Sequence, residues 1–230
     1  MKRKIFLLPL LAMLLAPCFT SCKDDNDGPQ LPYVYLNYRI EVLDNGIINA
    51  LANFTTAPYG GQRLKLTGGS SINVNGKSLV YYATDPDQEN TFDYGTDVTN
   101  RVTDGMVNFV FRHSTGDVVT SSFDLNTLPD FTIPELSPII KGKTYELFDE
   151  PNMNSSVQYR VQLIGDNNKV YDATFTPAGF SFSNAELVPG FYTLRYIQTS
   201  SKNISSAPGV LGGIIEVWKV KTRAGVRVEN

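Results

Sequence analysis

The only histidine of the chain, His113, stands in the segment FRHSTGD, at the end of an alternating run and the start of a polar turn. Ser114 and Asp117 follow closely, so a serine-nucleophile site is the first chemistry to consider. Such a site needs the nucleophile, the base and the orienting carboxylate in line, and neighbours in one tight turn cannot adopt that arrangement. We therefore expect His113 to be an exposed turn residue. A single histidine without a free cysteine also excludes the usual zinc ligand sets.

Two segments end like a phosphate-binding loop, NGKS at 75–78 and KGKT at 141–144. The full pattern needs another glycine five residues before its Gly-Lys pair and a helix after it. Ser71 and Ser137 occupy the positions of that glycine, and both segments lie between expected strands. We interpret these lysines as hairpin or linker residues.

Carboxylates gather once, in DPDQENTFDYGTD at 85–97. Oxygen-rich loops can bind Ca²⁺, so Asp85, Asp87 and Glu89 form a weak calcium candidate. The EF-hand spacing is absent, however, and charge clusters are usually solvated, which favours a solvated acidic loop. A glycosidase needs two carboxylates flanking a cleft, and nothing in the spacing pairs two of these. The sequence predicts neither an enzyme nor a cofactor.

The loop at 83–100 is long for a hairpin and carries aromatic side chains. Long loops on rigid scaffolds concentrate binding functions, and exposed aromatic rings stack on sugars or anchor a protein partner. Core or cross-strand packing is the competing explanation for Tyr81, Tyr82 and Trp218 and the favoured one. For Phe92 and Tyr94, a loop packed by its own aromatics is equally open. The ligand-binding candidates are Phe92, Tyr94, Tyr81, Tyr82 and Trp218.

The N-terminus has the layout of a secretory signal peptide. Three basic residues at 2–4 precede an apolar run at 5–15, and small or polar residues then lead to Cys22. The run is shorter than the roughly 20 apolar residues that a membrane-spanning helix needs. We expect residues 1–21 to be removed and residues 22–31 to form a flexible tether.

The segment FTSC is similar to the lipobox of bacterial lipoproteins, and SCKDDND resembles the export signal of surface lipoproteins in Bacteroidota. This resemblance implies that Cys22 is lipidated and that Lys23, Asp24 and Asp25 direct the protein to the outer leaflet. The implied location is the outer membrane, with the body of the protein facing the outside of the cell. Acyl chains such as palmitate contribute about 0.8 kcal/mol per buried CH₂, so several of them anchor a protein firmly. A solvated tether is the simpler reading of the same charged residues.

Removal of residues 1–21 takes three basic residues and no acidic one, which leaves 17 basic against 23 acidic residues and a net charge of −6. No basic run survives, so the composition argues against nucleic acid as a partner. Cys18 leaves with the signal peptide. An exported chain without a disulfide must depend on core packing, and 42% apolar residues supply the material for a core.

Nearly every segment alternates with period two. In YVYLNYRIEVL, the residues Val34, Leu36, Tyr38, Ile40 and Val42 fall on one face, and a second alternating run follows the Asn-Gly turn at 45–46. An Asn-Gly pair between two such runs is a strong hairpin signal. No mature segment holds a helical period over eleven residues. The pattern predicts an all-β chain of antiparallel, half-buried strands. Further expected strands lie at 63–66, 71–74, 78–82, 106–111, 118–125, 157–163, 170–175, 180–183, 191–197 and 214–220.

The segment LPDFTIPELSPIIKGK has three prolines, which disfavour a central strand. We place a domain boundary there, with one β-sandwich at 32–133 and a second at 134–230; a single continuous β structure stays open. ELVPGFYTLRYI resembles the tyrosine corner of immunoglobulin-like domains, in which the hydroxyl of Tyr192 would bond to nearby backbone while its ring packs inward. A core tyrosine after a turn is the equal alternative. The predicted fold is two tandem immunoglobulin-like sandwiches.

These features together predict a surface-tethered lipoprotein whose membrane contact is its N-terminal lipid anchor. Because no catalytic constellation is found, the expected function is non-catalytic binding, as glycan capture or adhesion. The alternative is an accessory protein–protein interaction subunit of an outer-membrane or surface assembly. A transporter pair encoded beside this protein would favour glycan capture.

Overall fold

The computed structural model describes residues 33–58, 61–82, 92–133, 135–136, 138–146, 157–166, 168–176 and 178–230. Within these ranges the chain is all-β, as the alternation predicts, with sixteen strands, two short 3-10 helices (Thr99–Arg101 and Leu125–Thr127) and no α-helix. The same residues include no helix long and apolar enough to span a membrane.

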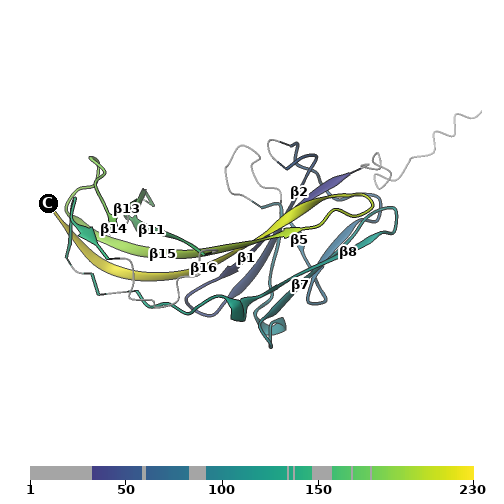
Figure 1. Cartoon of the computed structure of the whole chain (residues 1–230), viewed down its shortest axis with the longest axis horizontal. Coiled ribbons are helices and arrows are strands. Elements are labelled where there is room, and N and C mark those ends of the chain that lie inside the picture. The colour runs from purple at the N-terminus through teal and green to yellow at the C-terminus, as the bar shows by residue number, and fades with distance from the viewer. Residues whose placement is uncertain are drawn as a thin grey trace, which may run out of the picture.

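Nine strands form one large sheet in the order β12-β11-β15-β16-β1-β2-β6-β5, and β9 pairs with the far end of β16. Strand β1 runs parallel to β16, so the first and last described strands of the chain lie side by side (Figure 1). The strands of this sheet are β1 (Val34–Val42), β2 (Ile48–Thr55), β5 (Val80–Tyr81), β6 (Tyr94–Asp97), β9 (Ile139–Ile140), β11 (Gln158–Ile164), β12 (Val170–Asp172), β15 (Gly190–Ile204) and β16 (Val210–Glu229).

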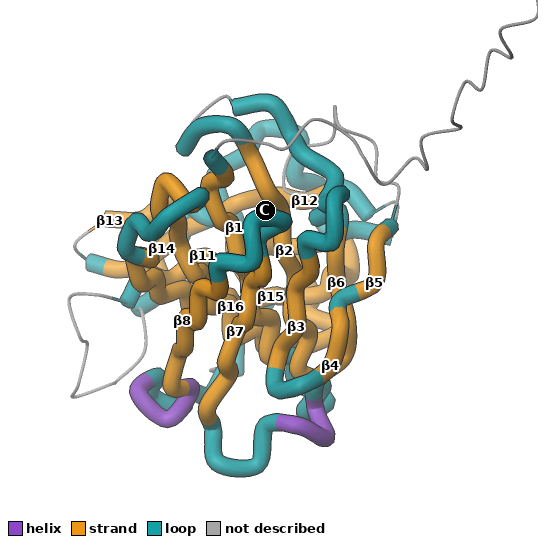
Figure 2. The backbone as a smooth tube through the Cα atoms, turned by 90° about the vertical axis from the view of Figure 1, so that its right-hand side faces the viewer, coloured by secondary structure: helices purple, strands orange, loops and turns teal. Residues whose placement is uncertain are grey.

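Two smaller sheets complete the structure. The four-stranded sheet has the order β4-β3-β7-β8, and its strands stand side by side in front of the large sheet in Figure 2. The three-stranded sheet has the order β10-β14-β13. Their strands are β3 (Ser71–Val74), β4 (Lys77–Ser78), β7 (Met106–Arg112), β8 (Val118–Asp124), β10 (Thr144–Tyr145), β13 (Thr174–Thr176) and β14 (Gly179–Ser181).

Both small sheets cover the same face of the large sheet. Tyr38 of β1 stacks on Phe109 of β7 with ring centroids 4.3 Å apart, and Tyr196 of β15 meets Phe180 of β14 edge-on at 6.0 Å. The pairing of β1 and β15 with β16 places Tyr38 and Tyr196 on one face, because their partners Ile215 and Lys221 are six positions apart along β16, an even number. The architecture is thus a two-layer β-sandwich in which two smaller sheets pack on one continuous sheet.

The hairpin of β15 and β16 joins two hydrophobic cores. Its strands have 15 and 20 residues and run along the molecule (Figure 1). The predicted strands at 191–197 and 214–220 are only parts of them. Near its turn the hairpin gives Ile204, Val210, Ile215 and Val217 to the core around β1, β2, β3 and β7. At its other end it gives Tyr192, Leu194, Tyr196, Val226 and Val228 to the core around Phe180. Residues after the predicted boundary at 134 therefore contribute to both cores.

The hairpin predicted from the Asn-Gly turn is confirmed. β1 and β2 pair antiparallel from Val42–Ile48 to Tyr35–Thr55, and Gly46 has the positive φ of 81° that this turn requires. Four of the five residues assigned to the inner face of β1 are buried; only Val42, at its end, is partly exposed. Arg39 departs from the pattern, because it lies on the outer face and is nevertheless only 5% exposed.

The tyrosine-corner hydrogen bond is also confirmed. The hydroxyl of Tyr192 donates to the carbonyl of Val188, four residues upstream, at 2.9 Å, and the side chain is 8% exposed. This bond fixes the turn at 188–190 onto the start of β15, as in the motif that the sequence resembles.

A polar junction separates the two cores on the inner face of the hairpin. Gln198 is fully buried there and donates to the hydroxyl of Tyr159 at 3.2 Å. The Nζ atoms of Lys219 and Lys221 lie 2.9 and 3.1 Å from Asp130 Oδ1. Hydrogen bonds from both lysines lower the pKa of Asp130 to about 2. The linker between the halves is thereby tied to the hairpin that both halves share.

Candidate functional site

The outer face of the large sheet is polar where β1, β2, β15 and β16 meet. The small sheets lie on the opposite face, so the alternate side chains of these strands point outward. The register places Asn37, Arg39 and Glu41 of β1 beside Ile214, Glu216 and Trp218 of β16. On the other side of β16, Thr199 and Ser201 of β15 pair with Trp218 and Glu216.

Arg39 is held between two aromatic rings at the centre of this face. Its Cζ lies 3.7 Å from the ring centroid of Trp218 and 4.5 Å from that of Phe92. Its Nη2 lies 3.2 Å from Glu216 Oε2. Burial lowers the pKa of Arg39, and the charge of Glu216 opposes that shift. Because a guanidinium is charged in proteins, Arg39 attracts the faces of both rings as a cation.

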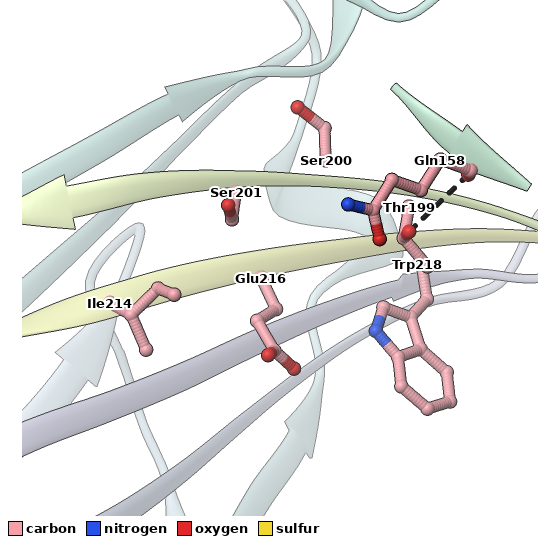
Figure 3. A pocket seen from close by; sticks show the side chains of 7 residues that line it. All are labelled: Gln158, Thr199, Ser200, Ser201, Ile214, Glu216 and Trp218. Carbon is pink, nitrogen blue, oxygen red and sulfur yellow. Dashed lines mark hydrogen bonds between the residues drawn. The ribbon is translucent and has the colours of Figure 1, made fainter. Parts of the chain in front are cut away.

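Two hollows adjoin this stack and share Ile214 and Glu216; we call them together the sheet-face groove. The first, of about 250 Å³, is lined by Gln158, Thr199, Ser200, Ser201, Ile214, Glu216 and Trp218 (Figure 3). The second, of about 270 Å³, is lined by Asn37, Tyr38, Arg39, Asn53, Thr55, Arg63, Phe92, Ile214 and Glu216. Each hollow is smaller than the roughly 300 Å³ at which small-molecule pockets begin. The groove therefore suits an extended ligand that lies along the sheet.

The charged groups that line the groove are paired. Arg39 bridges Glu216, and Arg63 Nη1 lies 3.3 Å from Asp93 Oδ1. The backbone N–H of Asp93 donates to Asn53 Oδ1 at 2.6 Å, which holds this segment against β2. The remaining polar lining consists of amides and hydroxyls, so the groove offers both donors and acceptors with little net charge.

The structure brings two of the five aromatic candidates together. Phe92 and Trp218, which are 126 positions apart in the sequence, meet on the two sides of Arg39. Both are partly exposed. For Trp218 the favoured expectation was core or cross-strand packing. Its ring lies on the outer face of the sheet, outside both cores, and packs across strands on Arg39 of β1.

Tyr94 does not lie on the surface, so its assignment as a ligand-binding aromatic is corrected. It is 6% exposed, and its ring meets Phe54 edge-on at 5.3 Å. Its hydroxyl accepts the backbone N–H of Leu66 at 2.7 Å. Strand β6 pairs with β2 and turns this side chain inward, so Tyr94 is a core residue.

Tyr81 and Tyr82 lie away from the groove, at the edge of the large sheet. They are 41% and 50% exposed. Tyr81 pairs across strands with Tyr94, at 5.2 Å between ring centroids, and Lys65 Nζ lies 4.7 Å from its ring. Cross-strand packing is thus confirmed for Tyr81, but neither tyrosine is a core residue.

His113 is buried, and the expectation of an exposed turn histidine is wrong. The residue is 3% exposed, and a Cβ placed on Gly209 would lie 3.2 Å from its ring, so the turn of the long hairpin covers it. Its Nδ1 is 2.8 Å from the hydroxyl of Thr115, which donates to Asp117 Oδ2 at 2.7 Å. Because this hydroxyl gives its proton to the carboxylate, the imidazole does not activate it as a nucleophile.

The other predicted site residues lie outside the described residues. These are the lipidation site Cys22, the export residues Lys23, Asp24 and Asp25, and the calcium candidates Asp85, Asp87 and Glu89. In the part of the chain that the structure describes, no three histidine, cysteine or carboxylate side chains gather closely enough to hold a metal ion.

Sequence reasoning missed Arg39, Glu216 and Gln158 as members of one site. The alternation of the first strand places Arg39 and Glu41 on the face opposite its apolar residues, but it does not distinguish a site from a solvated surface. The available signal is the segment EVWKV, in which Trp218 falls on the same face of the strand as Glu216.

Comparison of the chain with protein-family models, with curated proteins and with solved structures found no match. The functional assignment therefore depends on the groove itself.

Proposed function

We propose that this protein is a non-catalytic, lipid-anchored binding protein of the bacterial cell surface, and that its sheet-face groove captures a glycan. The observation that carries the proposal is the position of Trp218, an aromatic ring fixed by Arg39 beside amide, hydroxyl and carboxylate side chains. Aromatic faces stack on the C–H faces of sugars, while such polar groups exchange hydrogen bonds with sugar hydroxyls. A shallow groove also admits a polymer that continues beyond it at both ends.

The pairing of charges favours neutral sugars over acidic ones. A uronate or sulfate would need an unpaired cation, and both arginines of the groove already face carboxylates. A buried cation pairs with a new anion only if its own partner is displaced, which is costly. Neutral polysaccharides make use of the donors and acceptors without disturbing these pairs.

The test is a binding experiment with residues 23–230 on an array of neutral and acidic glycans, followed by affinity electrophoresis with the best neutral polysaccharide. We expect retardation by the polysaccharide and loss of retardation in Trp218→Ala. The control is Phe191→Ala, which removes a 68% exposed aromatic from the far end of β15. Absence of binding to any glycan, or equal losses in both variants, would refute the assignment.

The lipid anchor has its own test. In the host bacterium, Cys22→Ala is expected to release the protein from the membrane fraction. Replacement of Lys23, Asp24 and Asp25 by alanine should leave it anchored but hidden from protease added to intact cells. Mass spectrometry that shows an unmodified residue 22 in the mature protein would contradict both expectations.

A second candidate function is that of an accessory interaction subunit in a surface assembly. The observation that favours it is the row formed by Val80 and Tyr81 of β5 and the next residue, Tyr82. They are 55%, 41% and 50% exposed at the edge of the large sheet. Aromatic side chains are enriched at protein interfaces. If this function holds, a defined partner that copurifies with the lipidated protein should be lost in a Tyr81→Ser, Tyr82→Ser double variant and kept in Trp218→Ala.

A further inference from the structure

A third hollow, of about 400 Å³, lies between the two layers on the side of the molecule near the hairpin turn. We call it the edge groove. One wall is β8, with residues 118–122, and the other is the end of β15 with the turn that follows it, residues 202–207. No residue lines both the edge groove and the sheet-face groove, although strands of the same hairpin contribute to each.

In the part of the chain that the structure describes, both walls of the edge groove are strand edges with one paired side. Among the described strands, β8 is the last of the four-stranded sheet and pairs only with β7. β15 loses its outer neighbour at Thr199, the last residue that pairs with β11, so among the described strands only β16 pairs with residues 200–204. A strand edge presents a row of backbone donors and acceptors that another strand can pair with.

The floor of the edge groove is apolar, its rim carries hydroxyl groups, and one lysine lines it. Ile204 and Ile215 are buried beneath it, and Ser121, Ser122, Ser205 and Ser206 surround it. Lys202 crosses the groove, and its Nζ donates to the carbonyl of Ser122 at 2.9 Å. None of the ion pairs found among the described residues involves Lys202. Its charge is therefore available to an acidic group.

We propose that the edge groove accepts an extended peptide segment of a partner protein, which adds as a strand to β8 or to the end of β15. The open edges select a polypeptide over a glycan, because a second strand satisfies the backbone groups in regular register. Inward side chains of the peptide are small and apolar, and one of them is an aspartate or glutamate that pairs with Lys202. The seven residues of β8 offer an edge of about 23 Å at roughly 3.3 Å per residue.

The experiment uses residues 23–230 and two synthetic fluorescent peptides. The first is Thr-Val-Thr-Val-Thr-Asp-Thr-Val-Thr, and the second carries Lys in place of Asp. Fluorescence anisotropy is expected to show saturable binding of the acidic peptide, weakened about tenfold by Lys202→Glu, because the reversed charge replaces an attraction with a repulsion. The Lys202→Glu variant should in turn prefer the basic peptide. Trp218→Ala should bind both peptides as the unaltered chain does, which separates this site from the proposed glycan site.

Amide hydrogen exchange locates the bound peptide. The proposal expects slower exchange at residues 118–122 or 200–204 when the acidic peptide is present. The proposal would be overturned if the peptide bound without slowing amide exchange at either edge. It would also be overturned if the Lys202→Glu variant did not prefer the basic peptide. Protection in the free protein that disappears when residues 23–32 are removed would also overturn it, and would identify the chain's own N-terminal segment as the occupant.

Discussion

The hydroxyl of Tyr38 lies in the middle of the first core without a hydrogen-bond partner among the described residues. The side chain is 1% exposed, and its ring stacks on Phe109 at a centroid distance of 4.3 Å. Burial raises the pKa of this phenol far above its usual value. A buried hydroxyl that makes no hydrogen bond loses its solvation without compensation.

Tyr38→Phe removes this hydroxyl and keeps the stacked ring, so we expect the variant to be more stable. The expected gain in the free energy of unfolding is about 1 kcal/mol, the low end of the roughly 1–3 kcal/mol cost of an unsatisfied buried group. For a domain of this size, that gain raises the melting temperature by about 2–4 °C. Urea unfolding followed by circular dichroism measures the change, with the slope expected to stay the same.

Tyr192→Phe is the matched control, for which we expect a loss of stability instead of a gain. Its hydroxyl donates to Val188 at 2.9 Å, so the same chemical change removes a made hydrogen bond and should cost about 1 kcal/mol. If Tyr38→Phe is instead destabilised as much as Tyr192→Phe, the Tyr38 hydroxyl is bonded in solution. The reasoning about the first core would then be refuted.

Three further outcomes follow from the packing of the large sheet. Gly213→Ala should destabilise the protein by several kcal/mol in thermal unfolding, because the added Cβ would lie 2.2 Å from the carbonyl oxygen of Leu36 and disturb the pairing of β1 with β16. Gly190→Ala is the control: the atom nearest to its added Cβ is 3.7 Å away, so this variant should be almost neutral. Asp130→Asn should remove a small stabilisation, under about 1 kcal/mol, because the carboxylate is exposed. Folding lowers the pKa of Asp130 to about 2, so in acid titrations this stabilisation is present above about pH 4 and is lost as the pH falls toward 2. A fragment of residues 32–133 should show no cooperative unfolding in circular dichroism, because it lacks the hairpin that completes its core; a cooperative transition would establish it as an independent domain.

The sequence was sufficient to predict the local elements. The β1–β2 hairpin follows from an Asn-Gly turn between alternating runs, and the Tyr192 hydrogen bond follows from a motif of a few residues. It was not sufficient for the length of β15, because the alternation of apolar residues stops at Gln198 and Ser200. Those positions face the junction between the cores, where Gln198 is buried as a hydrogen-bonding group, so polar residues inside a continuous strand resemble the start of a loop.

The candidate site shows a second limit of prediction from the sequence. Trp218 and Phe92 were identifiable as aromatic candidates, but their common neighbour Arg39 was not, because the Arg39–Glu216 pair joins residues 177 positions apart across a parallel register. The burial of His113 has the same origin, since the residue that covers it, Gly209, belongs to the turn of the distant hairpin. Local patterns specify which face of a strand is polar, whereas only the register decides which polar residues meet.

The register that forms the cores is also the one that forms the groove. Along β16, Val217 points into the first core while Glu216 and Trp218 point out beside Arg39. Because side chains alternate strictly, a slip of one residue between β16 and its neighbours would bury Trp218 and Glu216 and expose Val217. The packing of the apolar side of the hairpin thus determines which side chains of the polar side line the groove. A binding surface on this hairpin therefore needs no separate scaffold, and its rigidity comes from the packing of two cores on a single sheet.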